Sequence, residues 1–269
     1  MPSPEVSIIL PVYNTARYLR VAIDSILQQS FTDFELIIIN DGSTDDSRNV
    51  IRSYTDSRIR YVENETNSGL VHSLNKGIEL SRAALIARMD GDDIAMSTRL
   101  AKQVRWMNAH PETDLLATRV SLIDGEDQPL PNWKDDEEAI TPEQILAYLP
   151  INNCIAHPSV MARTRLMKEY RYRYSQRLAE DYDLWLRMGA DGKRMEKLDE
   201  PLLKHRILSS SFTRTRQKNP FYKIMRVKFR FVKECRQEGK WNAFISKTFR
   251  FAMLDAAKGL GKQIKSYSK

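Results

Sequence analysis

Residues 6–42 read VSIILPVYNTARYLRVAIDSILQQSFTDFELIIINDG and determine the fold. Two short apolar runs in this stretch, at 6–10 and 35–39, are typical of buried parallel strands because polar residues do not alternate strictly with apolar ones. Between them, residues 16–29 carry apolar side chains at the spacing of one helix face. The stretch therefore predicts a strand, a helix and a second strand, which is the repeating unit of a parallel α/β sheet.

The alternation of strand and helix continues beyond this unit. Further strands are predicted at 59–62 and 85–89, with a helix at 70–80 between them. We expect an α/β fold with an open, mostly parallel sheet flanked by helices. In such sheets ligands bind beyond the carboxyl ends of the strands, so the polar residues that follow each apolar run are the first candidates for a site.

The pattern is less regular after residue 109. It predicts a strand at 115–120, an exposed acidic loop at 124–138, a short helix at 142–149, a helix beginning near residue 180 and an edge strand at 201–208. No internal repeat or Gly/Ser-rich linker interrupts the chain up to about residue 210. We therefore predict one domain over residues 1–210.

Residues 211–269 form a basic extension. Sixteen Lys and Arg oppose three acids in residues 214–269, which gives a net charge of +13 there and −6 in residues 1–213, out of +7 for the whole chain. Apolar residues recur at helical spacing on either side of Gly239, so two amphipathic helices are predicted. Such helices suit an anionic membrane face, although basic helices that pack on the domain fit the pattern equally well.

Composition and missing motifs exclude several classes of protein. The apolar fraction of 42% excludes a disordered or collagen-like chain. No GxGxxG or GxxxxGK[ST] motif is present, which argues against a hydride transferase and a P-loop ATPase, and the sequence has no HxH or HExxH metal cluster. Cys154 and Cys235 are too far apart for a CxxC pair. No apolar run of 18 residues and no basic leader occurs, so we expect a cytoplasmic protein, either soluble or peripheral at the inner face of the cell membrane.

Two acidic motifs follow predicted strands, DGSTDDS at 41–47 and DGDD at 90–93. Aspartate carboxylates repel phosphate groups, so they suit a phosphate-binding site only when a cation lies between the carboxylates and the phosphate. Mn²⁺ or Mg²⁺ fits this role because hard ions prefer oxygen ligands and can stabilise charge on a departing diphosphate. The alternative for either motif alone is that Asp-Gly dipeptides simply form turns.

Five motifs occur together in one order. They are PVYN (11–14), DGSTDDS (41–47), NSGL with LNKGI (67–78), DGDD (90–93) and EDYDLWLR (180–187). In this combination, which spans roughly residues 5–207, the chain resembles the inverting family 2 glycosyltransferases. The resemblance implies a GT-A fold, which is Rossmann-like, and a nucleotide-diphosphate sugar as the donor.

The resemblance also implies roles for single residues. The residues implied in binding the nucleotide sugar are Pro11, Val12, Tyr13, Asn14, Asp41, Asn67, Asp90 and Gly91. Tyr13 would stack on the base, usually uracil, and Asp41 would accept a hydrogen bond from it. Asp92 would contact the metal ion directly. Asp90, the second residue of the metal site, would bind the ribose or a water molecule on the metal ion.

Asp181 in the ED pair matches the catalytic base, which would take a proton from the acceptor hydroxyl. The alternative is that acids at positions 180–183 only stabilise a helix N-terminus. Glu180 is the next candidate for the base. His157 and Trp185 lie in motifs near such sites, but a histidine before proline and a tryptophan on an apolar helix face are more often structural.

We predict a metal-dependent inverting glycosyltransferase that moves a sugar, most commonly from a UDP-sugar, to a hydroxyl of a saccharide or polyprenyl-linked saccharide in surface polysaccharide synthesis. One alternative is a sugar-nucleotidyltransferase, although its glycine- and Lys/Arg-rich N-terminal loop is not present at residues 11–19. The other is a non-catalytic adaptor whose basic end binds membrane or nucleic acid. Nucleic acid is not expected, because no binding module accompanies the charge.

Overall fold

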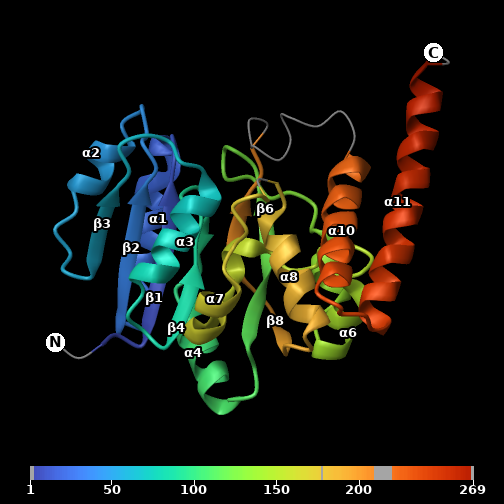
Figure 1. Cartoon of the computed structure of the whole chain (residues 1–269). Helices are drawn as coiled ribbons and strands as arrows, with labels where there is room; N and C mark the ends of the chain where they lie inside the picture. Colours follow the sequence, from blue (N-terminus) through green and yellow to red (C-terminus); the bar gives the residue numbers. More distant parts are fainter. Residues whose placement is uncertain (1–2, 177, 209–219, 268–269) are drawn as a thin grey trace.

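The computed structural model describes residues 3–176, 178–208 and 220–267, and it contains one sheet with helices on both faces (Figure 1). The strands are β1 (Val6–Val12), β2 (Phe34–Asn40), β3 (Ile59–Glu63), β4 (Leu85–Arg88), β5 (Ile94–Ala95), β6 (Leu115–Ile123), β7 (Met161–Arg163) and β8 (Met195–Arg206). The helices are α1 (Ala16–Leu27), α2 (Ser47–Arg52), α3 (Leu70–Leu80), α4 (Arg99–Ala109), α5 (Lys134–Glu138), α6 (Pro142–Tyr148), η1 (His157–Ser159), α7 (Thr164–Tyr170), α8 (Glu180–Ala190), α10 (Pro220–Gln237) and α11 (Ala243–Tyr267).

The strand order within the described residues is β3-β2-β1-β4-β7-β6-β8-β5. The first four strands are parallel, and the chain runs outward from β1 to β3 before it returns to β4 on the other side of β1. β6 and β8 are also parallel, whereas β7 and β5 pair antiparallel with their neighbours. The order of strands therefore reverses between β1 and β4, and open α/β sheets bind ligands at such a point.

Alternate residues of the central strands face two separate cores. Ile9, Ile37 and Ile39 pack with residues of α3 and α8 on one face of the sheet. Ile8 and Ile38 pack with residues of α1 and α4 on the other face. Because a strand buried on both faces needs apolar side chains in both directions, β1 and β2 read as nearly continuous apolar runs. The α/β sheet predicted from these runs is confirmed.

The structure corrects two expectations for the second half of the chain. Residues 124–138 are not an exposed loop throughout, because α5 forms at their end and Asp136 is buried in an ion pair with Lys197 (Oδ1 to Nζ, 2.9 Å). The strand predicted at 201–208 is not an edge strand. β8 begins earlier, at Met195, and lies between β6 and the two-residue β5.

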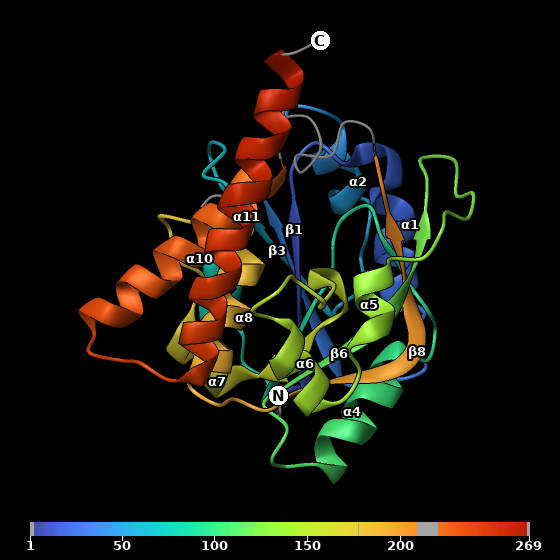
Figure 2. The same ribbon diagram turned by 90° about the vertical axis from the view of Figure 1, so that its right-hand side faces the viewer.

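The two predicted C-terminal helices are present as α10 and α11, which form a hairpin on the side of the body (Figure 2). Val227, Phe231 and Ile245 of this hairpin are buried in the same core as Trp185 of α8. Gly239 lies between the helices with a φ of +69°, a conformation that favours glycine. The predicted boundary at residue 210 falls outside the described residues. No helix in the described ranges has both the length and the apolar character needed to cross a membrane.

A buried ion pair joins the two helices of the hairpin to each other and to the body. Lys228 of α10 is fully buried and donates to Asp255 Oδ2 of α11 and to the Ile151 carbonyl, each at 2.7 Å. The Asp255 carboxylate thereby balances the charge of Lys228, and the Ile151 carbonyl accepts a second hydrogen bond from its ammonium group. The pair fixes the position of α10 relative to the loop that precedes η1.

We expect Lys228→Met to destabilise the protein by about 3 kcal/mol, because the substitution leaves the Asp255 carboxylate buried without its cation. A thermal denaturation curve should shift down by roughly 10 °C for a chain of this size. Lys233→Met on the exposed side of the same helix is the matched control and should leave the curve unchanged. Equal shifts for the two variants would contradict this role of Lys228.

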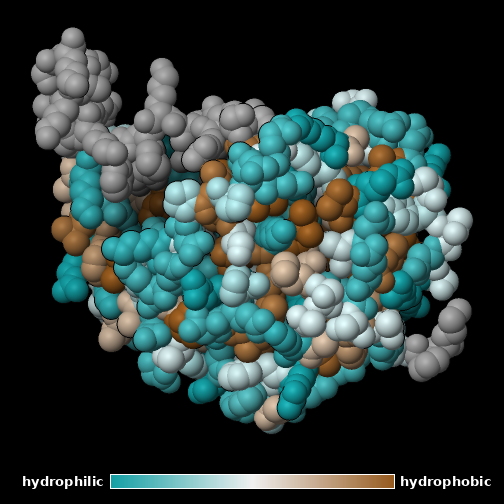
Figure 3. Space-filling model, turned by 180° about the vertical axis from the view of Figure 1, so that it is seen from behind, coloured by the Kyte–Doolittle hydropathy of each residue, from teal (hydrophilic) through white to brown (hydrophobic). Residues whose placement is uncertain are grey.

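Seen from behind, the molecule is covered mostly by hydrophilic residues, with hydrophobic residues in separate groups between them (Figure 3). Folded proteins commonly expose apolar residues in this scattered way.

Candidate functional site

The end of β1 leaves one aromatic ring exposed above a buried strand. Pro11 and Val12 are buried, whereas Tyr13 is 47% exposed. Asn14 follows with a φ of +53°, which asparagine tolerates better than most residues. Its Oδ1 accepts from the backbone N–H of Thr44 at 2.8 Å, so the loops after β1 and β2 are held together. This arrangement presents the Tyr13 ring at the carboxyl edge of the sheet.

Asp41, at the end of β2, is a buried acceptor for the loop that leads into α3. Its carboxylate accepts from Asn64 Nδ2 at 2.7 Å and from the backbone N–H groups of Ser68 and Gly69 at 3.0 and 2.8 Å. Asn67 lies exposed in this loop. A Cβ on Gly42 would lie 2.7 Å from the backbone of this loop, so only glycine fits there. Asp41 therefore orders the loop next to Tyr13.

Three aspartates follow β4. Asp90 and Asp92 are half-buried, and Asp93 is fully buried. Asp93 accepts from His205 Nδ1 at 3.0 Å and from the backbone N–H of Arg206 at 2.8 Å, which ties this loop to the end of β8. Gly91 is buried, and a Cβ there would lie 2.9 Å from Thr15 Oγ1. The loop therefore packs closely against the start of α1.

Within the described residues, Asp90 is paired with Arg88 and Asp93 with His205, whereas the Asp92 carboxylate has no ion-pair partner. Burial, and then the charges of Asp90 and Asp93, raise the pKa of Asp92 to about 7. Burial also raises the pKa of Asp90, although the Arg88 guanidinium opposes this shift. Burial lowers the pKa of His205, but the neighbouring Asp93 outweighs it and raises the value to about 9. Aspartates that repel each other in this way favour a bound cation.

Three side chains that can bind a metal ion lie together at this site: Asp90, Asp93 and His205. Each offers one ligand atom, and these atoms all lie within 4.8 Å of one another. Two carboxylates and an imidazole can hold a divalent ion once the imidazole has given up the proton that it shares with Asp93. Asp92, which the sequence singles out for direct metal contact, lies outside this group but close enough for its pKa to respond to Asp90 and Asp93. The two carboxylates therefore fit Mn²⁺ or Mg²⁺, and the imidazole favours Mn²⁺ of the two.

Glu180 and Asp181 lie at the N-terminus of α8, after Ala179 in the left-handed conformation. Asn153 Nδ2 donates to Asp181 Oδ2 at 2.8 Å and so orients the carboxylate. Burial raises the pKa of Asp181, and burial together with the charge of Asp181 raises that of Glu180 to about 7. The pair can therefore hold and release a proton near neutral pH, as a general base requires.

His157 and Trp185 have structural surroundings. His157 Nε2 lies 2.7 Å from the Tyr172 hydroxyl, and burial, followed by the charge of Arg88, lowers its pKa well below the usual value. Trp185 is fully buried in the core. A neutral, hydrogen-bonded histidine and a core tryptophan agree with the structural alternatives stated for both residues.

Sequence reasoning missed Arg88, the last residue of β4. Its side chain is 5% exposed and forms an ion pair with Asp90, and its charge also influences Glu180 and Asp181. Nε and Nη1 of Arg88 are buried and have no hydrogen-bond partner within the described part of the chain. An arginine inside the apolar strand LIARM was the available signal. The charge of Arg88 therefore acts on both the aspartate cluster and the ED pair.

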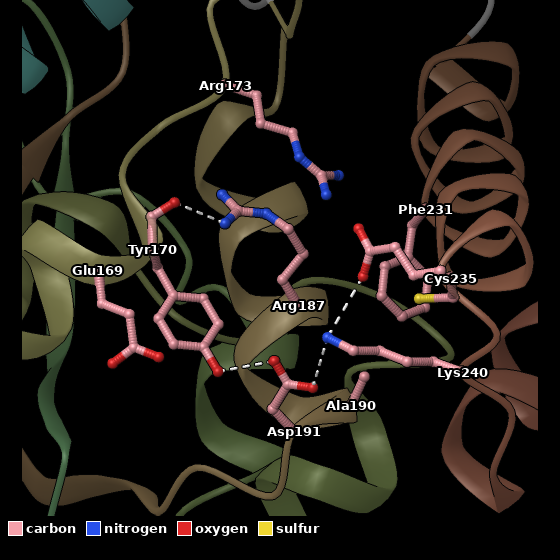
Figure 4. A pocket seen from close by; sticks show the side chains of 10 residues that line it. Glu169, Tyr170, Arg173, Arg187, Ala190, Asp191, Phe231, Cys235 and Lys240 are labelled. Carbon is pink, nitrogen blue, oxygen red and sulfur yellow. Dashed lines mark hydrogen bonds and ion pairs between the residues drawn. The ribbon is translucent and has the colours of Figure 1, made fainter.

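A separate hollow of about 200 Å³ lies between α7, α8 and α10 (Figure 4). The polar groups that line it are hydrogen-bonded to one another. Arg187 donates to the Tyr170 carbonyl, and the Tyr170 hydroxyl and the Lys240 ammonium group both donate to the Asp191 carboxylate. None of the residues predicted for the site lines it. We therefore assign the candidate site to the carboxyl edge of the sheet and not to this hollow.

Comparison with known proteins gives one consistent result. The family model described as Glycosyl transferase family 2 matches residues 7–171. The putative glycosyltransferase EpsE of Bacillus subtilis is 34% identical over 223 residues, which cover 78% of this chain and 76% of that protein. The O-antigen biosynthesis glycosyltransferase WbnJ of Escherichia coli is 33% identical over 211 residues, covering 77% and 81%.

Two solved structures share the fold. S. aureus TarS 1–349 in complex with UDP-GlcNAc matches with a TM-score of 0.68 at 19% identity, covering 85% of this chain and 66% of that one. The mannosyltransferase PcManGT from Pyrobaculum calidifontis, in complex with GDP-Man and Mn²⁺, matches with a TM-score of 0.62 at 16% identity, covering 98% and 76%. This chain thus spans less than two thirds of the TarS fragment's length, by a small margin. At these identities the matches establish the GT-A fold alone.

Proposed function

Since this chain belongs to glycosyl transferase family 2 and is a glycosyltransferase, we propose that it transfers a sugar, with inversion, from a nucleotide-diphosphate sugar to a hydroxyl group. A UDP-sugar is the favoured donor, and a saccharide or polyprenyl-linked saccharide the favoured acceptor, in the synthesis of a surface polysaccharide. The O-antigen role of WbnJ supports this pathway class.

The observation that carries the proposal is that one buried cation, Arg88 at the end of β4, acts on the aspartate cluster and on the ED pair, beside the point where the strand order reverses. Asp90, Asp93 and His205 gather beyond β4, and Tyr13 and Asp41 flank them beyond β1 and β2. We propose Mn²⁺ or Mg²⁺ at this cluster, held by Asp90 with Asp92 or with Asp93 and His205. When bound, such an ion stabilises negative charge on the departing diphosphate.

The chain's own groups perform the remaining steps. Tyr13 stacks on the base, and Asp41 orders the loop that carries Asn67 beside it. Asp181, oriented by Asn153, accepts the proton of the acceptor hydroxyl. As that proton leaves, the acceptor oxygen forms its bond to the anomeric carbon, and the electron pair of the breaking bond departs with the diphosphate. One displacement inverts the configuration.

We propose residues 1–210 as the catalytic domain and residues 211–269 as an extension that joins it through α10. The proposed location is the cytoplasmic side of a membrane, where a polyprenyl-linked acceptor would lie.

Release of a nucleoside diphosphate tests the proposal. The full chain is incubated with Mn²⁺ and a panel of UDP-, GDP- and dTDP-sugars, first without acceptor and then with saccharide acceptors. A transferase releases the diphosphate from at least one donor, and Asp181→Asn releases it about a thousandfold more slowly. Formation of pyrophosphate from a nucleoside triphosphate and a sugar phosphate would instead establish a nucleotidyltransferase.

We expect Tyr13→Ala to weaken UDP binding about tenfold, because stacking of a base on an aromatic ring contributes ~1–3 kcal/mol. Tyr13→Phe keeps the ring and should bind UDP within twofold of the wild type. Calorimetric titration with UDP and Mn²⁺ measures both variants. Tyr13 is half-exposed, so neither substitution should change the melting temperature. Equal affinities for the two variants would remove Tyr13 from the base site.

A further inference from the structure

A groove of about 910 Å³ opens between α10 and α11, away from the candidate site. Its lining combines apolar side chains with cations, chiefly Phe229, Val232, Trp241, Phe249, Lys233 and Arg236. Phe229 of α10 and Phe249 of α11 meet edge to face with their ring centres 6.2 Å apart. We call this feature the hairpin groove.

Exposed apolar side chains line the hairpin groove and continue beyond it along α11, at Met253 and Leu254. Trp241 is 55% exposed, Phe249 40%, Met253 52% and Leu254 45%. Phe249 and Met253 are four residues apart and so lie on the same side of the helix. Single exposed apolar residues are common, but four on one hairpin form a surface that favours contact with an apolar phase.

Most of the exposed cations around this apolar surface have no acidic partner among the described residues. In the part of the hairpin described at side-chain level, residues 222–259, all three acids form ion pairs: Glu234 with Arg173, Glu238 with Lys240, and Asp255 with Lys228. The exposed cations that form no ion pair within the described chain are Arg226, Lys233, Arg236, Arg250 and Lys258. The hairpin therefore presents excess positive charge beside exposed apolar groups.

We propose that the outer face of the α10–α11 hairpin, centred on the hairpin groove, docks onto a bilayer of acidic phospholipids. A helix with cations and large apolar groups on its exposed face binds such an interface through both charge and burial. A second copy of the hairpin would bring like charges together. The proposal deepens the proposed function, since a lipid-linked acceptor lies at such a surface, but it does not depend on the reaction.

Sedimentation of the full chain with vesicles tests the proposal. The probes are phosphatidylcholine vesicles with and without phosphatidylglycerol. Lys233→Gln/Arg236→Gln should weaken binding to the acidic vesicles roughly 25-fold, since each cation contributes about fivefold. Arg105→Gln/Arg165→Gln changes the net charge equally on exposed sites elsewhere and should leave binding within twofold.

A second pair of substitutions tests the apolar component. Trp241→Ser/Met253→Ser should also weaken vesicle binding at least tenfold, and this loss should persist at high salt, where the effect of the charge variant shrinks. In the wild type, Trp241 fluorescence should shift to shorter wavelength on acidic vesicles, and Trp241→Phe should lose that shift. Circular dichroism confirms that every variant is folded.

Several results would overturn the docking face. One is equal binding of the wild type to vesicles with and without phosphatidylglycerol, and another is an equal loss of binding in the Lys233/Arg236 and Arg105/Arg165 variants. A third is a protein that does not bind vesicles but uses the hairpin to self-associate or to bind nucleic acid. UDP binding measured on the same variants separates this inference from the proposed function. Normal UDP binding without vesicle binding refutes only the docking face, and the reverse result refutes only the donor site.

Discussion

Asp181→Asn should reduce turnover about a thousandfold while donor affinity stays within twofold of the wild type. The amide has the size of the carboxylate but cannot accept the proton of the acceptor hydroxyl, and a positioned general base contributes on the order of 10²–10⁴-fold. The hydrogen bond from Asn153 shows that the side chain is already oriented, so the substitution removes the proton acceptor without a large rearrangement. Initial rates and UDP titrations on the same preparation measure the two effects separately.

Glu180→Gln is the matched control, because Glu180 is the other acid of the pair. Its turnover should fall much less than that of Asp181→Asn. If Glu180→Gln were the more damaging substitution, the base would be Glu180.

The pH profile gives a second measure of the same base. Burial raises the pKa of Asp181, and the carboxylate accepts a proton only when it is ionised, so the rate should rise with pH through that raised value. The Asn153 hydrogen bond favours the ionised form, so Asn153→Ala should move this acid limb to higher pH. The residual activity of Asp181→Asn should show no such limb. An unchanged limb in Asp181→Asn would assign it to another group.

The sequence predicted the parallel strands β1 to β4 well and the short antiparallel strands β5 and β7 poorly, for a physical reason. β1 and β2 are buried on both faces, so nearly every residue in them is apolar and the runs are easy to recognise. β5 and β7 have two and three residues, which is too short to show any period. Their positions depend on pairing with β8, β4 and β6, which are distant in the chain.

The candidate site divides in the same way. Asp41, Asp90 and Asp92 directly follow apolar runs, so local sequence indicated them. His205 reaches Asp93 across 112 positions, and Asn153 reaches Asp181 across 28. Such contacts arise from the packing of β8 and of the loop before η1, and no local pattern encodes them.

The aspartate cluster leads to the second large expected effect. With Mn²⁺ present, Asp92→Asn should weaken UDP binding at least a hundredfold, ~3 kcal/mol. The reason is that the variant would no longer hold the metal ion whose positive charge attracts the diphosphate. In EDTA the same variant should bind UDP as well as the wild type or more tightly, since one repulsive carboxylate is gone. A substitution that only damaged the fold would weaken binding in both conditions. Calorimetric titrations with Mn²⁺ and with EDTA distinguish these outcomes.

His205→Gln extends this test to the group that the structure adds to the cluster. If His205 is a metal ligand, the substitution weakens UDP binding only when Mn²⁺ is present. If it acts as a cation beside Asp93, which its pKa of about 9 allows, binding weakens in EDTA as well. We expect the first result, about tenfold, because Asp90, Asp93 and His205 already lie within ligand distance of one another. Mn²⁺ should then support tighter UDP binding than Mg²⁺, since an imidazole nitrogen prefers the transition-metal ion. Equal binding with both ions and an unchanged His205→Gln affinity would leave Asp90 and Asp92 as the metal residues.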